Sequence, residues 1–207
     1  TKIKIFDPAC GSGNFLIIAY KKLRELEMSI LTRIDGLSGQ MSFSFSEIKL
    51  TQFYGIELDD FAHEVAILSL WLAEHQMNLE FYKAFGRTSP SLPLQNGGNI
   101  VHGNATRLDW EEVCPKHDGD EIYILGNPPF EGARKQKDFQ KDDMKFVFNN
   151  IKGYNNLDYV TCWFYKASKY IQNTNFKSAF VSTNSICQGE QVGILWSHIF
   201  NKNLEID

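Results

Sequence analysis

Short apolar segments alternate along this chain with longer segments of helical periodicity, and this alternation restricts the fold more than any other feature. Strands are expected at residues 3–6, 53–58, 100–102, 122–125 and 179–183. Helices with one apolar face are expected from Gly13 to about Met28 and over residues 60–76 and 157–172. Strands that alternate with helices are typical of a parallel sheet with helical crossovers. The sequence therefore predicts an α/β fold with an open, mostly parallel, twisted sheet flanked by helices.

Two segments interrupt this alternation. Residues 33–46 are rich in Ser and Gly, and residues 86–99 contain two prolines and a glycine pair. Both are expected to be surface insertions rather than domain boundaries. A length of 207 residues with 43% apolar residues suits one globular domain. Because the chain starts at Thr1 without Met and stops at Asp207 inside a new apolar segment, we expect a domain cut at both ends from a longer protein.

Charge and cysteine spacing exclude several classes of protein. The 21 Lys and Arg residues are outnumbered by 25 Asp and Glu residues, so the net charge is −4 and nucleic acid cannot be held by bulk positive charge. No apolar stretch approaches the roughly 20 residues of a membrane span. The four cysteines lack CxxC spacing, which predicts reduced thiols in a cytoplasmic protein. No metal site is expected either, because His63-Glu64 is not followed by the second His of HExxH.

A glycine-rich turn follows the first expected strand, with the sequence Asp7-Pro8-Ala9-Cys10-Gly11-Ser12-Gly13-Asn14-Phe15. Glycines let the backbone approach a ligand closely, and the next helix offers free N–H groups at its start. The turn is not a dinucleotide fingerprint, because position 16 is Leu, and it is not a P-loop, because Lys-Ser/Thr is missing. Two interpretations stay open: glycines required by turn geometry alone, or a cradle for a ligand other than a diphosphate.

An acidic residue, Glu57, ends the second expected strand in Gly55-Ile56-Glu57-Leu58-Asp59. Its carboxylate has the acceptors to bind both hydroxyl groups of a ribose. Alternatively, Glu57 caps the following helix, as Asp59 or Asp60 also could. A glycine turn combined with an acid at the end of the second strand favours a nucleoside site.

The segment Gly126-Asn127-Pro128-Pro129-Phe130 follows the apolar strand at residues 122–125. Two prolines fix the backbone and remove two N–H donors, so the local carbonyl groups stay free to accept hydrogen bonds. An amide oxygen, a carbonyl and a flat ring suit a planar substrate with an exocyclic amine. The alternative is that Asn-Pro-Pro forms a simple turn.

Taken together, Asp7-Pro8-Ala9-Cys10-Gly11-Ser12-Gly13 and Asn127-Pro128-Pro129-Phe130 resemble the S-adenosylmethionine-dependent DNA adenine-N6 methyltransferases. The closer resemblance is to the methylase domain of single-chain type II (IIG/IIL) restriction–modification enzymes. It rests on four longer segments: Phe53-Tyr54-Gly55-Ile56-Glu57, Leu70-Trp71-Leu72-Ala73-Glu74-His75-Gln76, Leu157-Asp158-Tyr159-Val160 and Ser182-Thr183-Asn184-Ser185-Ile186-Cys187-Gln188-Gly189-Glu190-Gln191. The resemblance implies a Rossmann-like methyltransferase fold for residues 1–207, S-adenosyl-L-methionine as cofactor and DNA as partner.

The resemblance also implies a set of cofactor-binding residues: Asp7, Pro8, Ala9, Cys10, Gly11, Gly13, Asn14, Phe15, Glu57, Leu58, Asn104 and Ala105. In this set, Asp7 and the turn up to Gly13 would hold the methionine part, and Glu57 would hold the ribose. Asn104 stands where the family usually has Asp to accept a hydrogen bond from the cofactor adenine. An amide oxygen keeps that contact with weaker acceptance; the alternative is that Asn104 is only a turn residue.

The implied catalytic residues are Asn127, Pro128, Pro129 and Phe130. The Asn127 side-chain oxygen and the Pro128 carbonyl would accept the two hydrogens of adenine N6, so that its lone pair points at the sulfonium methyl group for in-line displacement. Phe130 would stack on the base, which must leave the duplex to reach the pocket. This chemistry requires no metal and no covalent nucleophile.

The segment after these residues has an interleaved charge pattern: Arg134, Lys135, Lys137, Lys141 and Lys145 alternate with Asp138, Asp142 and Asp143. The charges are interpreted either as solvated surface or, for Arg134 and Lys135, as contacts to DNA phosphates. Residues 182–191 are expected either to shape the pocket of the target base or to cap the next helix.

Other functions remain as alternatives to adenine methylation. Asn-Pro-Pro-aromatic also serves methyltransferases of protein glutamine and of guanine N2 in ribosomal RNA, and cytosine N4 in DNA is a further candidate. A catalytically silent module used only in assembly is the non-enzymatic alternative. The resemblance places a cofactor-closing segment before Thr1 and a target-recognition domain beyond Asp207, so residues 1–207 alone are expected to bind DNA weakly.

Overall fold

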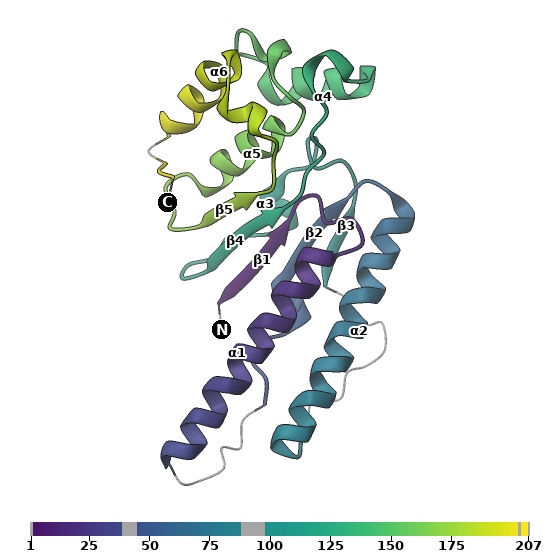
Figure 1. Cartoon of the computed structure of the whole chain (residues 1–207), viewed down its shortest axis with the longest axis vertical. Helices are drawn as coiled ribbons and strands as arrows, with labels where there is room; N and C mark the ends of the chain where they lie inside the picture. The colour runs from purple at the N-terminus through teal and green to yellow at the C-terminus, as the bar shows by residue number, and fades with distance from the viewer. Residues whose placement is uncertain (1, 39–44, 88–97, 203, 207) are drawn as a thin grey trace.

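A five-stranded parallel sheet forms the centre of the computed structural model, which describes residues 2–38, 45–87, 98–202 and 204–206 (Figure 1). The strands are β1 Ile3–Asp7, β2 Phe53–Glu57, β3 Asn99–His102, β4 Glu121–Gly126 and β5 Lys177–Phe180. Their order in the sheet is β3-β2-β1-β4-β5, and each neighbouring pair is parallel. The predicted fold class is confirmed. The strand order reverses between β1 and β4, which is where open α/β sheets form their binding crevice.

Helices cover both faces of this sheet. The helices α1 Asn14–Ser38 and α2 Asp60–Phe85 lie side by side on one face, and α3 Trp110–Val113, α5 Thr161–Ile171 and α6 Glu190–Phe200 lie on the other (Figure 1). The helix α4 Asp138–Phe148 follows β4 and lies beyond the end of the sheet. Within the described ranges, no helix combines the length and apolar character needed to cross a membrane.

The two faces of the sheet build two separate cores, because successive side chains of a strand point to opposite faces. In β1, Ile5 packs with α1 and α2, whereas its neighbour Phe6 packs with α3 and α5. Phe6 is completely buried and meets the ring of Trp110 edge to face at 5.3 Å. Full burial of one such side chain stabilises the fold by roughly 1.5–3 kcal/mol. Strand β1 is therefore held from both faces, which fixes the position of its last residue, Asp7.

The helices α1 and α2 are longer than the sequence predicted. We expected α1 to end near residue 28 and residues 33–46 to form an insertion, but α1 continues to Ser38; residues 39–44 lie outside the described part. Helix α2 continues nine residues beyond the expected residue 76, because Met77, Phe81 and Phe85 extend its buried face. It ends at Gly86, whose φ of 70° suits a residue without a side chain and whose N–H donates to Tyr82.

A buried arginine joins these two helices. Arg24 of α1 is 2% exposed and donates to the Tyr20 hydroxyl at 2.5 Å and to the Asn78 side chain of α2 at 3.1 Å. Its partners lie up to 54 residues away in the sequence.

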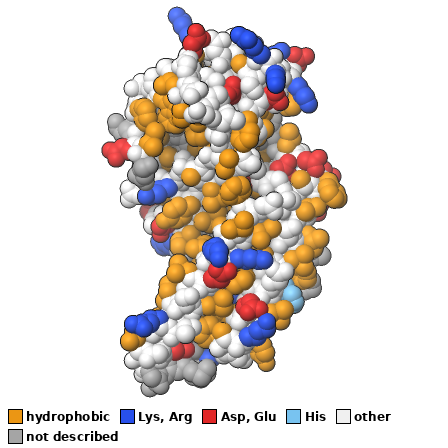
Figure 2. Space-filling view, in the orientation of Figure 1, with side chains coloured by type: hydrophobic (Ala, Val, Ile, Leu, Met, Phe, Trp, Pro, Cys, Tyr) orange, Lys and Arg blue, Asp and Glu red, His pale blue; other side chains and the backbone are white. Residues whose placement is uncertain are grey.

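Figure 2 shows hydrophobic side chains over much of the face formed by α1 and α2, and α1 alone exposes more than half of Ile18 and of Leu26.

Smaller differences concern β5, α5 and the second predicted insertion. Strand β5 runs from residue 177 to residue 180 instead of 179–183. Helix α5 begins at Thr161 rather than at residue 157, since residues 157–160 contact the loops at the end of the sheet instead of continuing a helix. Most of the predicted insertion at residues 86–99 lies outside the described residues. The four cysteines are free, and all but Cys187 are buried.

Candidate functional site

The expected site residues lie at one edge of the sheet. Asp7 ends β1, Glu57 ends β2, Asn104 follows β3 by two residues and Asn127 directly follows β4. All of these strands run in the same direction, so their carboxyl ends share the edge that lies uppermost in Figure 1. The four residues therefore lie at or just after the carboxyl ends of β1 to β4.

The glycine turn folds back on itself between β1 and α1. Gly13 donates its N–H to the Cys10 carbonyl at 2.8 Å, and Gly11 and Gly13 have φ values of 55° and 86°. A Cβ atom at Gly13 would lie 3.4 Å from Ala66 of α2, an ordinary contact distance, so the positive φ rather than a lack of space favours glycine there. The turn is tied to β2 as well, because Cys10 donates its N–H to the Ile56 carbonyl at 3.1 Å.

Glu57 joins the glycine turn to the loop after β2. Its two carboxylate oxygens accept from the N–H groups of Gly11 and Asp59, both at 2.8 Å. Helix α2 is capped by Asp59, whose side chain accepts from the Ala62 N–H, so the capping alternative for Glu57 is wrong. Each carboxylate oxygen has a second lone pair. Glu57 can therefore accept hydroxyl groups without giving up its contact with Gly11.

Asp7 is a buried carboxylate with one unsatisfied oxygen. It is 1% exposed; Oδ1 accepts from the Ala9 N–H at 2.9 Å, whereas Oδ2 has no hydrogen-bond partner among the described residues. Burial raises the pKa of Asp7 to about 7; the Ala9 N–H opposes this increase and the charge of Glu57 adds to it. A buried carboxylate oxygen without a donor is costly. A cationic group at Oδ2 would remove that cost.

Gly126 brings the end of β4 against Asp7. A Cβ atom at position 126 would lie only 2.5 Å from Asp7 Oδ1, so no other residue fits without displacing the carboxylate. The Gly126 carbonyl accepts from the Val181 N–H at 2.9 Å, which fixes this backbone from the side of β5. The buried carboxylate and the segment that begins at Asn127 are therefore direct neighbours.

The segment from Asn127 to Phe130 presents both buried and exposed groups. Pro128 is buried, whereas Asn127, Pro129 and Phe130 are exposed. Within the described chain, the Asn127 side chain has no hydrogen-bond partner, and 37% of Phe130 is exposed. The amide of Asn127 is thus available to a ligand. Two apolar residues of the glycine turn and of the loop after β2 are also exposed, Phe15 by 39% and Leu58 by 56%.

Asn104 has a different environment from the one expected of a ligand contact. Its side-chain oxygen accepts from both the N–H and the hydroxyl group of Thr106, at 2.9 and 2.7 Å. Its amide nitrogen donates to Asp143 at 2.9 Å. Asn104 therefore fulfils the turn role, and a contact with a cofactor stays a prediction that requires the Thr106 hydroxyl to turn away. Ala105, beside it, is buried.

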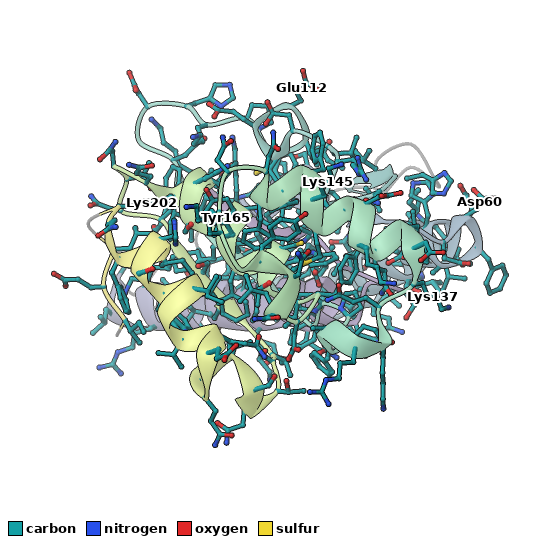
Figure 3. All side chains as sticks on the ribbon, turned by 90° about the horizontal axis from the view of Figure 1, so that it is seen from above. Asp60, Glu112, Lys137, Lys145, Tyr165 and Lys202 are labelled. Atoms are coloured by element: carbon teal, nitrogen blue, oxygen red, sulfur yellow. The ribbon has the colours of Figure 1, made fainter. Side chains whose placement is uncertain are left out.

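Asp143 corrects the interpretation of the charged segment. The sequence suggested that it belongs to a solvated charge pattern, but it is 2% exposed and accepts from Asn104, from Arg107 Nε at 2.5 Å and from the Tyr159 hydroxyl at 2.6 Å. Arg134 and Lys135 are exposed, as expected of surface cations. Figure 3 shows Lys137 and Lys145 at the two ends of α4 on the outside of the molecule.

Sequence reasoning missed several residues that shape this site: Thr106, Gly126, Asp143, Tyr159 and Trp163. Gly126 had a usable signal, because a glycine directly before Asn-Pro-Pro indicates a close backbone approach. Thr106 bonds to Asn104 two residues earlier, a local Asx-turn contact, so it also had a usable signal. The contacts of Asp143, Tyr159 and Trp163 join residues remote in the sequence, and no local pattern reveals them.

Comparisons with known proteins agree on one family. Residues 1–207 match the family model described as "MmeI, DNA-methyltransferase domain". "DNA methyltransferase A" of Bacillus subtilis (strain 168) is 51% identical over 207 residues, which are 100% of this chain and 23% of the relative.

Solved structures show the same relationship. The type IIL restriction-modification enzyme MmeI in complex with DNA matches 97% of this chain with a TM-score of 0.86 at 43% identity, over 27% of its own length. The ATP-dependent type ISP enzyme LlaBIII bound to DNA matches with a TM-score of 0.55 at 16% identity, which shows a shared fold alone. The chain thus spans about a quarter of the length of its two most similar relatives named here.

Proposed function

The chain belongs to the DNA-methyltransferase domain family of MmeI, and on this basis we propose that it transfers a methyl group from S-adenosyl-L-methionine to the N6 amino group of adenine in DNA. The family membership confirms the resemblance inferred from the sequence; the cofactor and the adenine target are our proposal. One observation carries it: the unsatisfied, buried carboxylate of Asp7 lies against Gly126, directly before the exposed Asn127. A site for a cationic cofactor and an amine-binding group are thereby adjacent.

The residues present fit the proposed cofactor. Asp7 Oδ2 has no donor of its own, which suits the ammonium group of a methionine moiety, and both Glu57 oxygens keep a lone pair for the ribose hydroxyls. The residues that would hold the cofactor are those expected from the sequence: Asp7, Pro8, Ala9, Cys10, Gly11, Gly13, Asn14, Phe15, Glu57, Leu58, Asn104 and Ala105. When bound, the cofactor supplies an electrophilic methyl group on a positively charged sulfur.

The exposed segment after β4 would bind and orient the target amine. Asn127 Oδ1 and the Pro128 carbonyl accept hydrogen bonds from the two N6 hydrogens, which draws the nitrogen toward tetrahedral geometry and withdraws its lone pair from conjugation with the ring. During transfer the nitrogen becomes positively charged, and the Asn127 oxygen and the Pro128 carbonyl stabilise that charge through their hydrogen bonds. The nitrogen then releases one proton to water. Phe130 stacks on the base after it has left the duplex.

Substitution of Asn127 tests this role in the full-length polypeptide that carries residues 1–207. Asn127→Leu removes the acceptor at nearly constant size, so methyl transfer to DNA should fall by about 10²–10³-fold, as after loss of one charge-stabilising group. Cofactor binding, measured by calorimetry, should stay within about two-fold. The matched variant Asn127→Asp keeps an acceptor oxygen and should retain more turnover than Asn127→Leu. Near wild-type turnover in Asn127→Leu would refute the assignment.

The methylated product identifies the substrate. Digestion of methylated DNA to nucleosides and mass spectrometry should yield N6-methyladenine. If the product is N4-methylcytosine, the target base is cytosine instead of adenine, and the roles proposed for the site residues are unchanged. Methylation of protein glutamine or of guanine in ribosomal RNA, or no transfer by the full-length protein, would contradict the proposed DNA activity.

We further propose that residues 1–207 form the catalytic domain of a longer protein that belongs to a restriction–modification or modification system.

Exposed Arg134 and Lys135 would contact DNA phosphates close to the catalytic segment. Replacing both by Gln should reduce the salt dependence of DNA binding by about one ion per residue. Lys83→Gln, near the far end of α2, serves as the control. An unchanged salt dependence would exclude the phosphate contacts.

A further inference from the structure

The segment 157–163 is linked to three of the four turns of the candidate site, two of them directly and one through Asp143, although the proposed function assigns it no role. It contains Leu157-Asp158-Tyr159-Val160, which precede α5, and the first three residues of that helix. We propose that this segment positions the cofactor pocket relative to Asn127, with Tyr159 and Asp158 as its principal positioning residues. This inference rests on the proposed function and names the residues that hold its site together.

The first contact reaches the turn after β3. The Tyr159 hydroxyl donates to Asp143 at 2.6 Å, and Asp143 accepts the amide of Asn104 at 2.9 Å. Tyr159 is 3% exposed and Asp143 is 2% exposed, so water does not compete for these bonds. Burial alone would raise the pKa of Asp143, but the bonds from Tyr159, Asn104 and Arg107 outweigh it and keep the carboxylate ionised. Hydrogen bonds to a buried charge are stronger than neutral ones.

The second contact reaches the glycine turn. Trp163 donates its indole N–H to the Pro8 carbonyl at 2.9 Å, across 155 residues of sequence. The rings of Tyr159 and Trp163 meet edge to face, with their centroids 5.4 Å apart. The position of Tyr159 is therefore coupled mechanically to the turn that begins at Asp7.

The third contact reaches the segment after the catalytic residues. The Tyr159 N–H donates to the Glu131 carbonyl at 2.8 Å, one residue beyond Phe130. Asp158 is 8% exposed; its carboxylate accepts from Ser185, and a longer contact of 3.4 Å joins it to the Ala133 N–H. Asp158 thus ties the loop after Phe130 to the segment after β5, where the structure places one of the four family-like sequence segments.

Tyr159 and Asp158 make different contacts, so substitutions of the two residues should have different effects. The Tyr159 side chain acts toward the cofactor turns, whereas the Asp158 side chain acts toward the loop of Asn127. In the full-length protein, Tyr159→Phe should therefore weaken binding of S-adenosyl-L-methionine by about 3- to 30-fold. This is less than the roughly 10- to 150-fold equivalent of a whole hydrogen bond to a charged group, because Tyr159 acts on the cofactor turns through Asp143 and Asn104. Its kcat at saturating cofactor should stay within about two-fold.

Asp158→Asn should have the opposite effect and change kcat instead of cofactor affinity. Its kcat should fall about ten-fold or more, while cofactor affinity stays near that of the wild type, because a displaced catalytic segment impairs transfer more than binding. Two matched variants control for loss of stability. Tyr170→Phe removes a buried hydroxyl on α5, the helix that follows the segment, which bonds to the Cys114 carbonyl at 2.5 Å, and Asp120→Asn alters an ion pair with Lys4 at the opposite edge of the sheet. Neither control should change cofactor affinity or kcat.

Hydrogen–deuterium exchange without cofactor provides a readout independent of activity. Tyr159→Phe should accelerate exchange in residues 103–108, where the Thr106 N–H is bonded to Asn104, and Tyr170→Phe should not. Equal exchange and equal cofactor affinity in the two variants would overturn the inference. If the wild type fails to methylate DNA, the proposed function falls, but the exchange comparison still decides whether the 157–163 segment positions the site.

Discussion

Asp7→Asn is the substitution whose effect follows most directly from the structure. The pKa of the Asp7 carboxyl group rises from its usual value of 3.8 to about 7, chiefly because the group is buried. A folded-state pKa above the unfolded one means that the folded chain binds this proton more tightly. The ionised form is therefore penalised, and stability is lost as pH rises from about 4 to about 7. In full, this penalty amounts to about 4 kcal/mol.

The asparagine variant removes the penalty but has a cost of its own. Its oxygen can still accept from the Ala9 N–H, whereas its NH₂ group occupies the place of Oδ2, which has no partner. An unsatisfied buried donor costs about 1–3 kcal/mol at any pH. At pH 5 the wild-type penalty is only about 1.5 kcal/mol, so the two proteins should be similar in stability or the variant slightly weaker. At pH 8 the variant should be more stable by about 1–3 kcal/mol.

Urea unfolding of both chains from pH 5 to pH 8 measures this difference. The constant cost of the amide cancels in the comparison, so the free-energy difference should change by about 2–3 kcal/mol over this range. Asp120→Asn is the control: although burial opposes it, the bonds from Lys4 and from the His117 N–H hold the pKa of Asp120 below its usual value. Above pH 5 its effect should therefore change by no more than about 1 kcal/mol, the contribution of the exposed pair that Asp120 forms with the His117 ring at 3.4 Å. A constant effect of Asp7→Asn, or an Asp7 carboxyl resonance that titrates near pH 4, would refute the reasoning.

Three further predictions follow from packing. In urea denaturation, Gly126→Ala should destabilise the chain by about 1–3 kcal/mol, because its Cβ atom would strike Asp7, and it should also weaken cofactor binding. The control Gly36→Ala, on α1, has no atom within 4 Å of its Cβ and should stabilise the chain by about 0.5–1 kcal/mol. Iodoacetamide followed by peptide mass spectrometry should label Cys187 first, and equal labelling of the buried cysteines would contradict the fold. Arg24→Met should cost about 3 kcal/mol by leaving its buried partners unpaired, and a loss below about 1 kcal/mol would show that this link between α1 and α2 is weak.

The placement of the candidate residues at one end of the sheet was predictable because it depends only on strand assignment. Asp7, Glu57, Asn104 and Asn127 each follow an apolar run within two residues, and parallel strands bring such positions to one edge. The distance between these residues along the sequence does not matter for this argument. The argument requires the end of each strand to be predicted to within about one residue. The apolar runs predicted the ends of β1 to β4 with that accuracy.

The lengths of α1 and α2 were not predictable by the same reasoning. Helical periodicity continues weakly after Met28 and Gln76, in segments that also contain polar and turn-forming residues. For α2, tertiary packing decides the extension: Arg24 of α1 donates to Asn78, and Met77 and Phe81 are buried in the core. Such contacts override local propensity, and a single sequence does not report them.

Asp143 and Asn104 show why the chemistry of a site can differ from its sequence pattern. The family resemblance treats Asn104 as a weaker substitute for an Asp that accepts a hydrogen bond from the cofactor. In the structure, however, its NH₂ group donates to Asp143, which an ionised Asp at position 104 could not do. Two carboxylates there would instead repel each other in a buried site. The amide at 104 is therefore matched to a carboxylate 39 residues later, and the negative charge beside this turn comes from α4 rather than from the residue after β3.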